Sequence, residues 1–228
     1  AHRLGIKTEF LKTDWQRGAI PEKIYERLKK DTEKQIKAVC VVHNETSTGS
    51  TSRIKEVRDA INSANHDALL MVDTISGLAS MEYKHDEWDV DVTVSGSQKG
   101  LMLPPGLSFN AISEKAIKIS KKSGMRRSYW DWEEQIEANR YGSFPYTPAT
   151  NLLYGLKEAI KMLHEEGLEK VYKRHDRHAK ATRLAVQAWG LEVLCKEERD
   201  YSSVVTAVVL PETHNADTVS YTHLRAHE

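Results

Sequence analysis

The sequence predicts an α/β fold in which a mostly parallel sheet lies between helices, followed by the start of a smaller α+β C-terminal domain. Short apolar segments alternate with longer segments whose apolar residues recur every three or four positions, a pattern typical of strands that alternate with helices. Turn residues and polar side chains directly follow several of the apolar segments. This order favours parallel strands joined by crossover helices.

The predicted strands of the sheet are rich in apolar and β-branched residues. They are Ile6–Leu11, Ile36–Val42, Ala68–Val72, Asp91–Val94 and Leu107–Ile112. Ile36–Val42 is almost continuously apolar, as expected for a strand that is buried on both faces.

Helices are predicted between and after these strands. One opens at Pro21, and another covers Arg53–Ser63, where Ile54, Val57 and Ile61 share one face. The later helices are Pro148–Leu163, which Gly167 follows as a stop signal, and Leu168–Trp189.

We place a domain boundary near Gly167. Residues 1–167 would form part of a large domain, and residues 168–218 would begin a smaller one whose first strands are Leu191–Cys195 and Ser203–Leu210. The chain starts without a methionine, and the composition of residues 219–228 shifts abruptly. We therefore expect a truncated chain with a non-native tail at 219–228, to which no function is assigned.

Composition excludes several classes of protein. The 228 residues are 39% hydrophobic, which is typical of a globular chain, and 33 basic residues balance 33 acidic ones. A balanced charge gives no net field to attract nucleic acid or an anionic membrane, and no apolar run reaches the ~20 residues that span a bilayer. Cys40 and Cys195 are interpreted as buried free thiols, which fits a cytoplasmic location.

Two strand ends carry the chemistry. Asp73 follows one predicted strand, and Lys99 follows the next, between Gly96 and Gly100. Pyridoxal phosphate needs an amine to hold its aldehyde as a Schiff base and a carboxylate to keep its pyridine nitrogen protonated. The pair therefore suits a pyridoxal phosphate site. No metal site is predicted.

The motifs around these residues extend the pattern. They are 43–49 (HNETSTG), 72–76 (VDTIS), 95–106 (SGSQKGLMLPPG) and 144–154 (FPYTPATNLLY). In this order the chain resembles the class V, fold-type I pyridoxal phosphate-dependent aminotransferases, and within them the group that uses serine or alanine with glyoxylate. The resemblance runs from about residue 1 to residue 215.

The resemblance implies a role for each matched residue. Lys99 would form the internal aldimine and move a proton at the substrate's Cα, and Asp73 would pair with the pyridinium nitrogen. Ile75 would lie against the pyridine ring, Gln98 would reach the cofactor phosphate, and Thr46 would bind near the phenolic oxygen.

The resemblance also implies a homodimer with shared sites. Thr147 would reach the phosphate bound by the neighbouring subunit. Phe144 stands where some relatives carry a phosphate-binding tyrosine, so this chain departs from the pattern there. The family's phosphate cradle would lie before residue 1, and its carboxylate-binding arginine beyond the matched region.

Simpler interpretations stand beside these roles. Lys99 could be a solvated lysine, Asp73 a turn or helix-capping residue, Ile75 a core residue and Thr46 a turn residue. The resemblance, taken with the paired Asp73 and Lys99, favours transfer of an amino group from serine or alanine to glyoxylate, giving glycine. The alternatives are another class V enzyme, including a cysteine desulfurase-like lyase, and an inactive truncated product.

Other residues suggest less chemistry. His175 and His178 share a helical spacing compatible with a metal, but basic neighbours favour a solvated face. Trp130 and Tyr141 are interpreted as core or interface aromatics.

Overall fold

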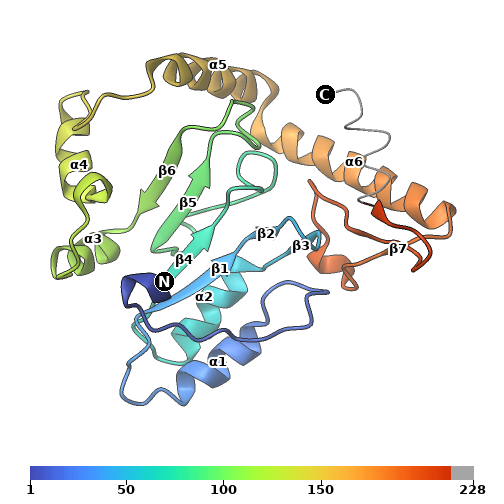
Figure 1. Ribbon diagram of the computed structural model, residues 1–228, viewed down its shortest axis with the longest axis horizontal. Coiled ribbons are helices and arrows are strands. Elements are labelled where there is room, and N and C mark those ends of the chain that lie inside the picture. Colours follow the sequence, from blue (N-terminus) through green and yellow to red (C-terminus); the bar gives the residue numbers. More distant parts are fainter. Residues whose placement is uncertain (217–228) are drawn as a thin grey trace.

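The computed structural model describes residues 1–216, so the predicted tail at 219–228 lies outside the described residues. Figure 1 shows a central sheet with helices around it. The described elements are η1 (His2–Leu4), α1 (Pro21–Lys29), β1 (Ala38–Val42), β2 (Asn44–Glu45), β3 (Ser50–Thr51), α2 (Ile54–Ser63), β4 (Leu69–Asp73), β5 (Val92–Gly96), β6 (Ser108–Ile112), α3 (Glu114–Lys121), η2 (Ser128–Trp130), α4 (Trp132–Arg140), α5 (Thr150–Glu166), α6 (Leu168–Ala188), β7 (Glu192–Val193), η3 (Glu198–Asp200) and β8 (Val208–Val209).

The central sheet has the strand order β1-β4-β5-β6. β1, β4 and β5 are parallel, and β6 runs antiparallel to β5. The prediction of a mostly parallel sheet is therefore confirmed, and four of the predicted strands form it. Parallel strands end at one edge of the sheet, so the segments that follow β1, β4 and β5 are brought together there.

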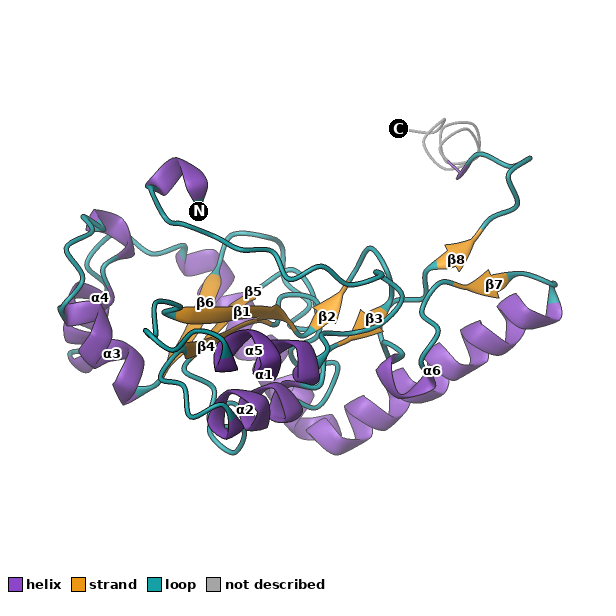
Figure 2. Cartoon of the chain, turned by 90° about the horizontal axis from the view of Figure 1, so that it is seen from below, coloured by secondary structure: helices purple, strands orange, loops and turns teal. Residues whose placement is uncertain are grey.

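Helices α1 and α2 cover one face of this sheet (Figure 2). Ile24 and Leu28 of α1, with Val57 and Ile61 of α2, form one core cluster with strand residues such as Leu70. Spacings of three and four residues place each pair on the inner side of its helix. The predicted helices opened by Pro21 and covering residues 53–63 are thus confirmed.

The prediction for β1 was wrong in one respect. Its side chains alternate, with Val41 buried but Cys40 and Val42 exposed, so β1 is not buried on both faces. Both cysteines are free, and Cys195 is buried, but the expectation of a buried Cys40 was also wrong.

The predicted strand Ile6–Leu11 was likewise wrong. Residues 6–14 contain no helix or strand, and Phe10 is 68% exposed. A strand needs a paired neighbour for its backbone groups, and this segment pairs with no strand of residues 1–216. It is held beside α1 by a bidentate ion pair in which Arg27 donates to Glu9 at 2.8 and 2.9 Å.

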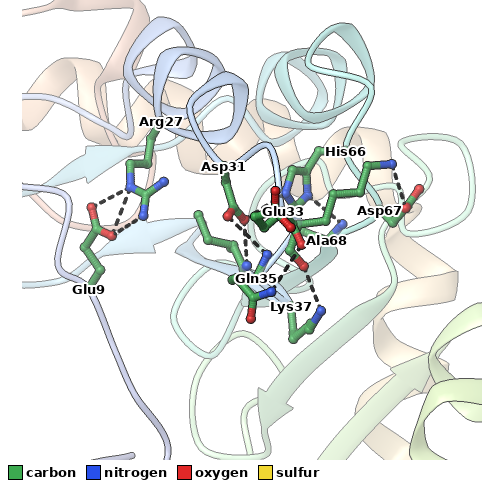
Figure 3. A network of polar contacts seen from close by, with 11 residues as sticks. Glu9, Arg27, Asp31, Glu33, Gln35, Lys37, His66, Asp67 and Ala68 are labelled. Atoms are coloured by element: carbon green, nitrogen blue, oxygen red, sulfur yellow. Dashed lines mark hydrogen bonds and ion pairs between the residues drawn. The ribbon is translucent and has the colours of Figure 1, made fainter.

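A small polar network fixes the connections into β1 and β4 (Figure 3). The Asp31 carboxylate accepts hydrogen bonds from the Ile36 N–H at 2.7 Å and the Gln35 N–H at 3.1 Å. His66 Nδ1 accepts from the Ala68 N–H, so Nε2 carries the proton and donates to Asp31 at 3.1 Å. The Ile36 hydrogen bond is the largest of the effects that lower the pKa of the Asp31 carboxyl.

The buried carboxylate of Asp91, just before β5, joins several elements. It accepts hydrogen bonds from Arg58 of α2 at 2.5 Å, from the Leu70 N–H at 2.8 Å and from the Ser113 hydroxyl at 3.1 Å. The Arg58 and Asp91 side chains are only 4% and 3% exposed. The interactions tie α2 to β4 and to the end of β6.

The C-terminal part contains the predicted long helices, observed as α5 and α6, which meet at Gly167. The two predicted strands exist, but they shrink to the two-residue pairs of β7 and β8. This part contacts the β2–β3 hairpin, where Tyr201 bridges Ser50, and it contacts the segment before α1, where the Gly18 N–H donates to the buried Asp200 at 3.2 Å.

Residues 123–149, which include α4, expose several aromatic side chains. Trp130 and Tyr141 are each 79% exposed, so the core interpretation of these two residues was wrong. In residues 1–216 no helix is both long and apolar enough to cross a lipid bilayer.

We predict that replacing Asp91 by alanine lowers the free energy of unfolding by about 3–5 kcal/mol, because it removes the buried partner of Arg58 and leaves that charge only its longer ion pair with the exposed Asp89, at 3.6 Å. Asp59→Ala is the matched control, since Asp59 forms an exposed pair with Lys55 on the same helix and should cost less than about 1 kcal/mol. Urea denaturation measures both, and equal losses would contradict the assignment.

Candidate active site

The candidate site lies where β1, β4 and β5 end. Val42 pairs with Asp73, and Asp73 pairs with Val94, so the three strands stop within a few residues of one another. The segment after β1 carries Thr46, β4 ends at Asp73, and the turn after β5 carries Lys99. Segments from separate parts of the sequence therefore lie together at one edge of the sheet (Figure 1).

Two glycines allow these turns to approach one another closely. A Cβ on Gly100 would lie 2.1 Å from the Leu78 carbonyl oxygen, in the turn that follows Asp73. A Cβ on Gly77 would lie 2.9 Å from Nδ1 of His43, at the end of β1. Both separations are too short for a real side chain, so the Lys99 turn is seated directly on the Asp73 turn.

Side-chain hydrogen bonds reinforce the two junctions. Asn44 Nδ2 donates to Ser76 Oγ at 2.8 Å, and the Ser76 hydroxyl donates to the Asn44 carbonyl at 2.6 Å. The buried Ser97 hydroxyl donates to the Pro104 carbonyl at 2.7 Å and accepts from the Leu107 N–H at 3.2 Å. These bonds close the 97–107 loop, in which the Met102 N–H donates to the Lys99 carbonyl at 2.8 Å.

Lys99 lines a cavity of about 440 Å³. Its ammonium group makes no hydrogen bond or ion pair with any of residues 1–216. Thr46 lines the same cavity, as do the hydroxyl residues Ser76 and Ser80. The structure therefore brings together two of the predicted site residues around one open volume.

The other predicted residues lie outside that lining. Asp73 is exposed, and its Oδ1 accepts a hydrogen bond from the Ile75 N–H at 2.8 Å, while Oδ2 accepts none from residues 1–216. The Gln98 amide folds towards Gly96, where a Cβ would lie 2.9 Å from its oxygen. Thr147 is exposed on the segment between α4 and α5.

The residues fit a pyridoxal phosphate group in two respects. An unpaired amine stands on a cavity wall, and an adjacent strand end offers a carboxylate oxygen without a partner. Lys99 would hold the aldehyde, and Asp73 would hold the ring nitrogen protonated. The turn interpretation of Asp73 is compatible with this, because only one of its oxygens is used in the turn.

A buried histidine lies at the end of β1, next to the turn that follows Asp73. His43 is 3% exposed, its ring centre lies 5.2 Å from that of Tyr83, and its Nδ1 has no hydrogen-bond partner within the described chain. Burial lowers the pKa of His43 to about 4, and burial also raises the pKa of Tyr83 to about 12. Both rings therefore stay neutral near pH 7.

Sequence reasoning missed part of the cavity wall. Arg174 and His175 of α6 line the cavity and are half-buried. The interpretation of this region as a fully solvated basic face is therefore wrong for these two residues, but it is correct for the exposed Arg177 and His178. A signal was present in the spacing. His175 follows the buried Val171 by four residues, which places it on the inward side of α6.

The comparisons with known proteins identify the family. The model of the family described as Aminotransferase class-V matches residues 1–225. This chain belongs to the class V aminotransferase family. The resemblance stated from the motifs is therefore confirmed.

Relatives at higher identity share one activity name. The serine–glyoxylate aminotransferase of Methylorubrum extorquens is 51% identical over 217 residues, covering 93% of this chain and 54% of that protein. The one from Arabidopsis thaliana is 42% identical over 92% of this chain and 52% of that protein. The chain thus spans about half the length of these relatives.

Solved structures agree on the fold. The ureidoglycine–glyoxylate aminotransferase from Bacillus subtilis superposes with a TM-score of 0.85 at 31% identity, covering 99% of this chain and 58% of that one. The pyridoxamine–pyruvate aminotransferase from Mesorhizobium loti also gives 0.85, at 28% identity over 92% of this chain and 53% of that one. The predicted fold class is confirmed.

We predict that Gly100→Ala lowers the free energy of unfolding by about 1–3 kcal/mol, because the new methyl group would collide with the Leu78 carbonyl. Gly124→Ala is the control, since a Cβ there meets nothing within 4 Å. Urea denaturation measures the change in stability. The rate at which an acylating reagent modifies Lys99 measures whether the turn that carries it has moved. Equal behaviour of the two variants would contradict the seating of the turns.

We predict that His43 makes the fold acid-sensitive between about pH 6.5 and pH 4. In this window the unfolded chain binds a proton that the folded imidazole does not, so stability falls as the pH falls, by at most about 3 kcal/mol. His43→Phe should remove this part of the slope, and replacement of the exposed His178 should not. Unfolding free energies measured at several pH values test this.

Proposed function

We propose that the protein is a pyridoxal phosphate-dependent aminotransferase that moves the amino group of serine, or alanine, to glyoxylate. The observation that carries the proposal is Lys99, an unpaired amine on a cavity wall at the carboxyl edge of the sheet, one strand away from Asp73. Membership of the class V family supports the reaction class.

The cofactor, when bound, supplies a protonated ring that withdraws electrons from the substrate's Cα. Lys99 then holds and returns the proton at that carbon. The Asp73 carboxylate keeps the ring nitrogen protonated. Ile75, Gln98 and Thr46 are proposed to contact the ring face, the phosphate and the phenolic-oxygen side.

The names of the relatives support the acceptor more strongly than the donor. Serine–glyoxylate, L-aspartate–glyoxylate and (S)-ureidoglycine–glyoxylate enzymes all match this chain, at 51%, 39% and 31% identity. Glyoxylate recurs while the amino donor changes. Serine is proposed as donor because the relatives at 42–51% identity carry that name.

Two alternatives predict different outcomes. A desulfurase-like lyase would release sulfur from cysteine, but the likeness to a cysteine desulfurase from Thermococcus onnurineus, at 17% identity, concerns the fold alone. An inactive truncated product would retain no cofactor.

The proposed assembly is a homodimer with shared sites. Thr147 lies on an exposed segment, where the rings of Tyr129 and Tyr146 contact each other at a tilt of 48° with centres 4.9 Å apart. Exposed aromatic groups of this kind are typical of interfaces, which supports a contribution of Thr147 to the site of a partner. We also propose the division into residues 1–167 and 168–218.

We predict that borohydride reduction after loading with pyridoxal phosphate and gel filtration fixes one phosphopyridoxyl group on Lys99. Lys99→Ala should reduce the adduct at least tenfold, because the described lining of the cavity contains no other lysine. Peptide mass spectrometry locates and quantifies the group.

Lys180→Ala is the matched control, since this exposed lysine lies on α6 and outside the cavity lining. An adduct that persists in Lys99→Ala would sink the assignment of Lys99. Loss of all cofactor from the unmodified chain would favour the inactive product.

A further inference from the structure

We propose that Asn44 is a positioning residue that fixes the direction of the Asp73 carboxylate, and that it acts through Ser76. Asn44 begins β2, two residues after the end of β1, and Ser76 lies three residues beyond the end of β4. Asn44 does not line the cavity that holds Lys99, so it acts through the neighbouring turn and not by contact with a bound group. The use of Asp73 to hold a ring nitrogen protonated rests on the proposed function.

Asn44 and Ser76 form a reciprocal pair of hydrogen bonds. The Ser76 hydroxyl donates its only proton to the Asn44 backbone carbonyl at 2.6 Å. The side-chain atom of Asn44 that faces this hydroxyl must therefore be a donor, which assigns it as Nδ2, at 2.8 Å from Ser76 Oγ. A reversed amide would place two acceptors against each other, so the amide has one allowed orientation.

This orientation leaves the amide oxygen of Asn44 without a donor. Asn44 is 2% exposed, and its Oδ1 accepts no hydrogen bond from residues 1–216. A buried acceptor without a partner costs free energy and offsets much of the gain from the Nδ2 hydrogen bond. The pair therefore contributes less to overall stability than two ordinary hydrogen bonds would, and its main effect is to hold Ser76 at a fixed distance from the end of β1.

Ser76 belongs to the turn that orients Asp73. The start of this turn is fixed to the sheet, because the Thr74 N–H donates to a carbonyl of β5 at 2.8 Å. The Ile75 N–H then donates to Asp73 Oδ1 at 2.8 Å. A turn held only at its start could rotate this N–H and the carboxylate that it binds. The hydrogen bonds to Asn44 fix the turn on the far side of Ile75 and so prevent that rotation.

The same pair connects the other parts of the site. Asn44 is paired with β3 in the hairpin that carries Thr46. Two residues beyond Ser76, the Leu78 carbonyl lies where a Cβ on Gly100 would come within 2.1 Å of it. A displacement of Ser76 would therefore also reach the turn that presents the amine.

The test compares the binding of two cofactors. Pyridoxal phosphate has a ring nitrogen that Asp73 can hold protonated, whereas its deaza analogue has a CH group in that place. Dissociation constants of both are measured by absorbance titration of the purified chain. A second measurement needs no cofactor, because NMR follows hydrogen exchange of the Ile75 N–H, with the Thr74 N–H as an internal reference.

We expect Asn44→Ala to weaken binding of pyridoxal phosphate about fivefold, since the ring nitrogen loses a well-directed acceptor, and to change binding of the deaza analogue by less than about twofold. Ser76→Ala should have the same effect, and Ser76→Thr, which retains the hydroxyl, should retain the affinity. In the cofactor-free chain, Asn44→Ala should accelerate exchange of the Ile75 N–H about tenfold while the Thr74 N–H stays protected.

Asn110→Ala is the matched control. Its amide also donates to a serine, Ser108, at 3.4 Å, but it is exposed on β6, so both affinities and the exchange of Ile75 should be unchanged. If Asn44→Ala does not fold, Ser76→Ala carries the same expectations.

Equal losses of affinity for the two cofactors in a folded Asn44→Ala variant would overturn the proposal, because a merely structural role weakens both. Unchanged exchange of the Ile75 N–H would also overturn it. In an Asp73→Ala background, Asn44→Ala should have no further effect on pyridoxal phosphate binding, and a further fivefold loss would contradict action through Asp73.

Failure of the proposed function is a separate outcome. An unmodified chain that binds no pyridoxal phosphate removes the proposed transamination, and the exchange of the Ile75 N–H then decides by itself whether Asn44 positions Asp73. A normal Lys99 adduct with equal cofactor affinities in the unmodified chain and in Asn44→Ala removes the role of Asn44 alone.

Discussion

The buried carboxylate of Asp91 is the constraint on which the site depends. It neutralises Arg58 inside the protein and accepts hydrogen bonds from the Leu70 backbone and the Ser113 hydroxyl. A buried charge is tolerated only when it is paired and hydrogen-bonded, so α2, β4 and the end of β6 are held in one arrangement around it. That arrangement sets the register of β4 with β5, and hence the place at which each strand ends.

At the opposite end of these strands, close packing of the backbone at two glycines determines the position of the turns. Gly100 lies against the Leu78 carbonyl and Gly77 against His43, so the turns that present Lys99 and Asp73 are positioned by contacts that no larger residue would permit. The Asn44–Ser76 hydrogen bonds and the buried Ser97 hydroxyl then restrict the loops. Lys99 itself needs no side-chain partner to be placed, and its amine remains available.

The sequence was sufficient for features that depend on local pattern. The placement of Asp73 and Lys99 at the carboxyl edge could be predicted, because polar residues that directly follow parallel apolar strands lie at that edge of the sheet. The sequence was insufficient where contacts with a neighbouring element decide whether a segment forms a strand or a residue is buried. Ile6–Leu11 has the composition of a strand but pairs with none within residues 1–216, and Cys40 is apolar in sequence but lies on an exposed face of β1. Arg174 looked like surface charge because its counterion, Glu166, belongs to the preceding helix.

The junction of α5 and α6 contributes both to the arrangement of the helices and to the wall of the cavity. Gly167 was predicted as a helix stop and a boundary, and its left-handed backbone lets Glu166 turn back onto Arg174. The same turn brings Val171 and His175 against the cavity that holds Lys99. The Glu166–Arg174 ion pair therefore joins the two helices beside that cavity, with 36% and 40% of the two side chains exposed.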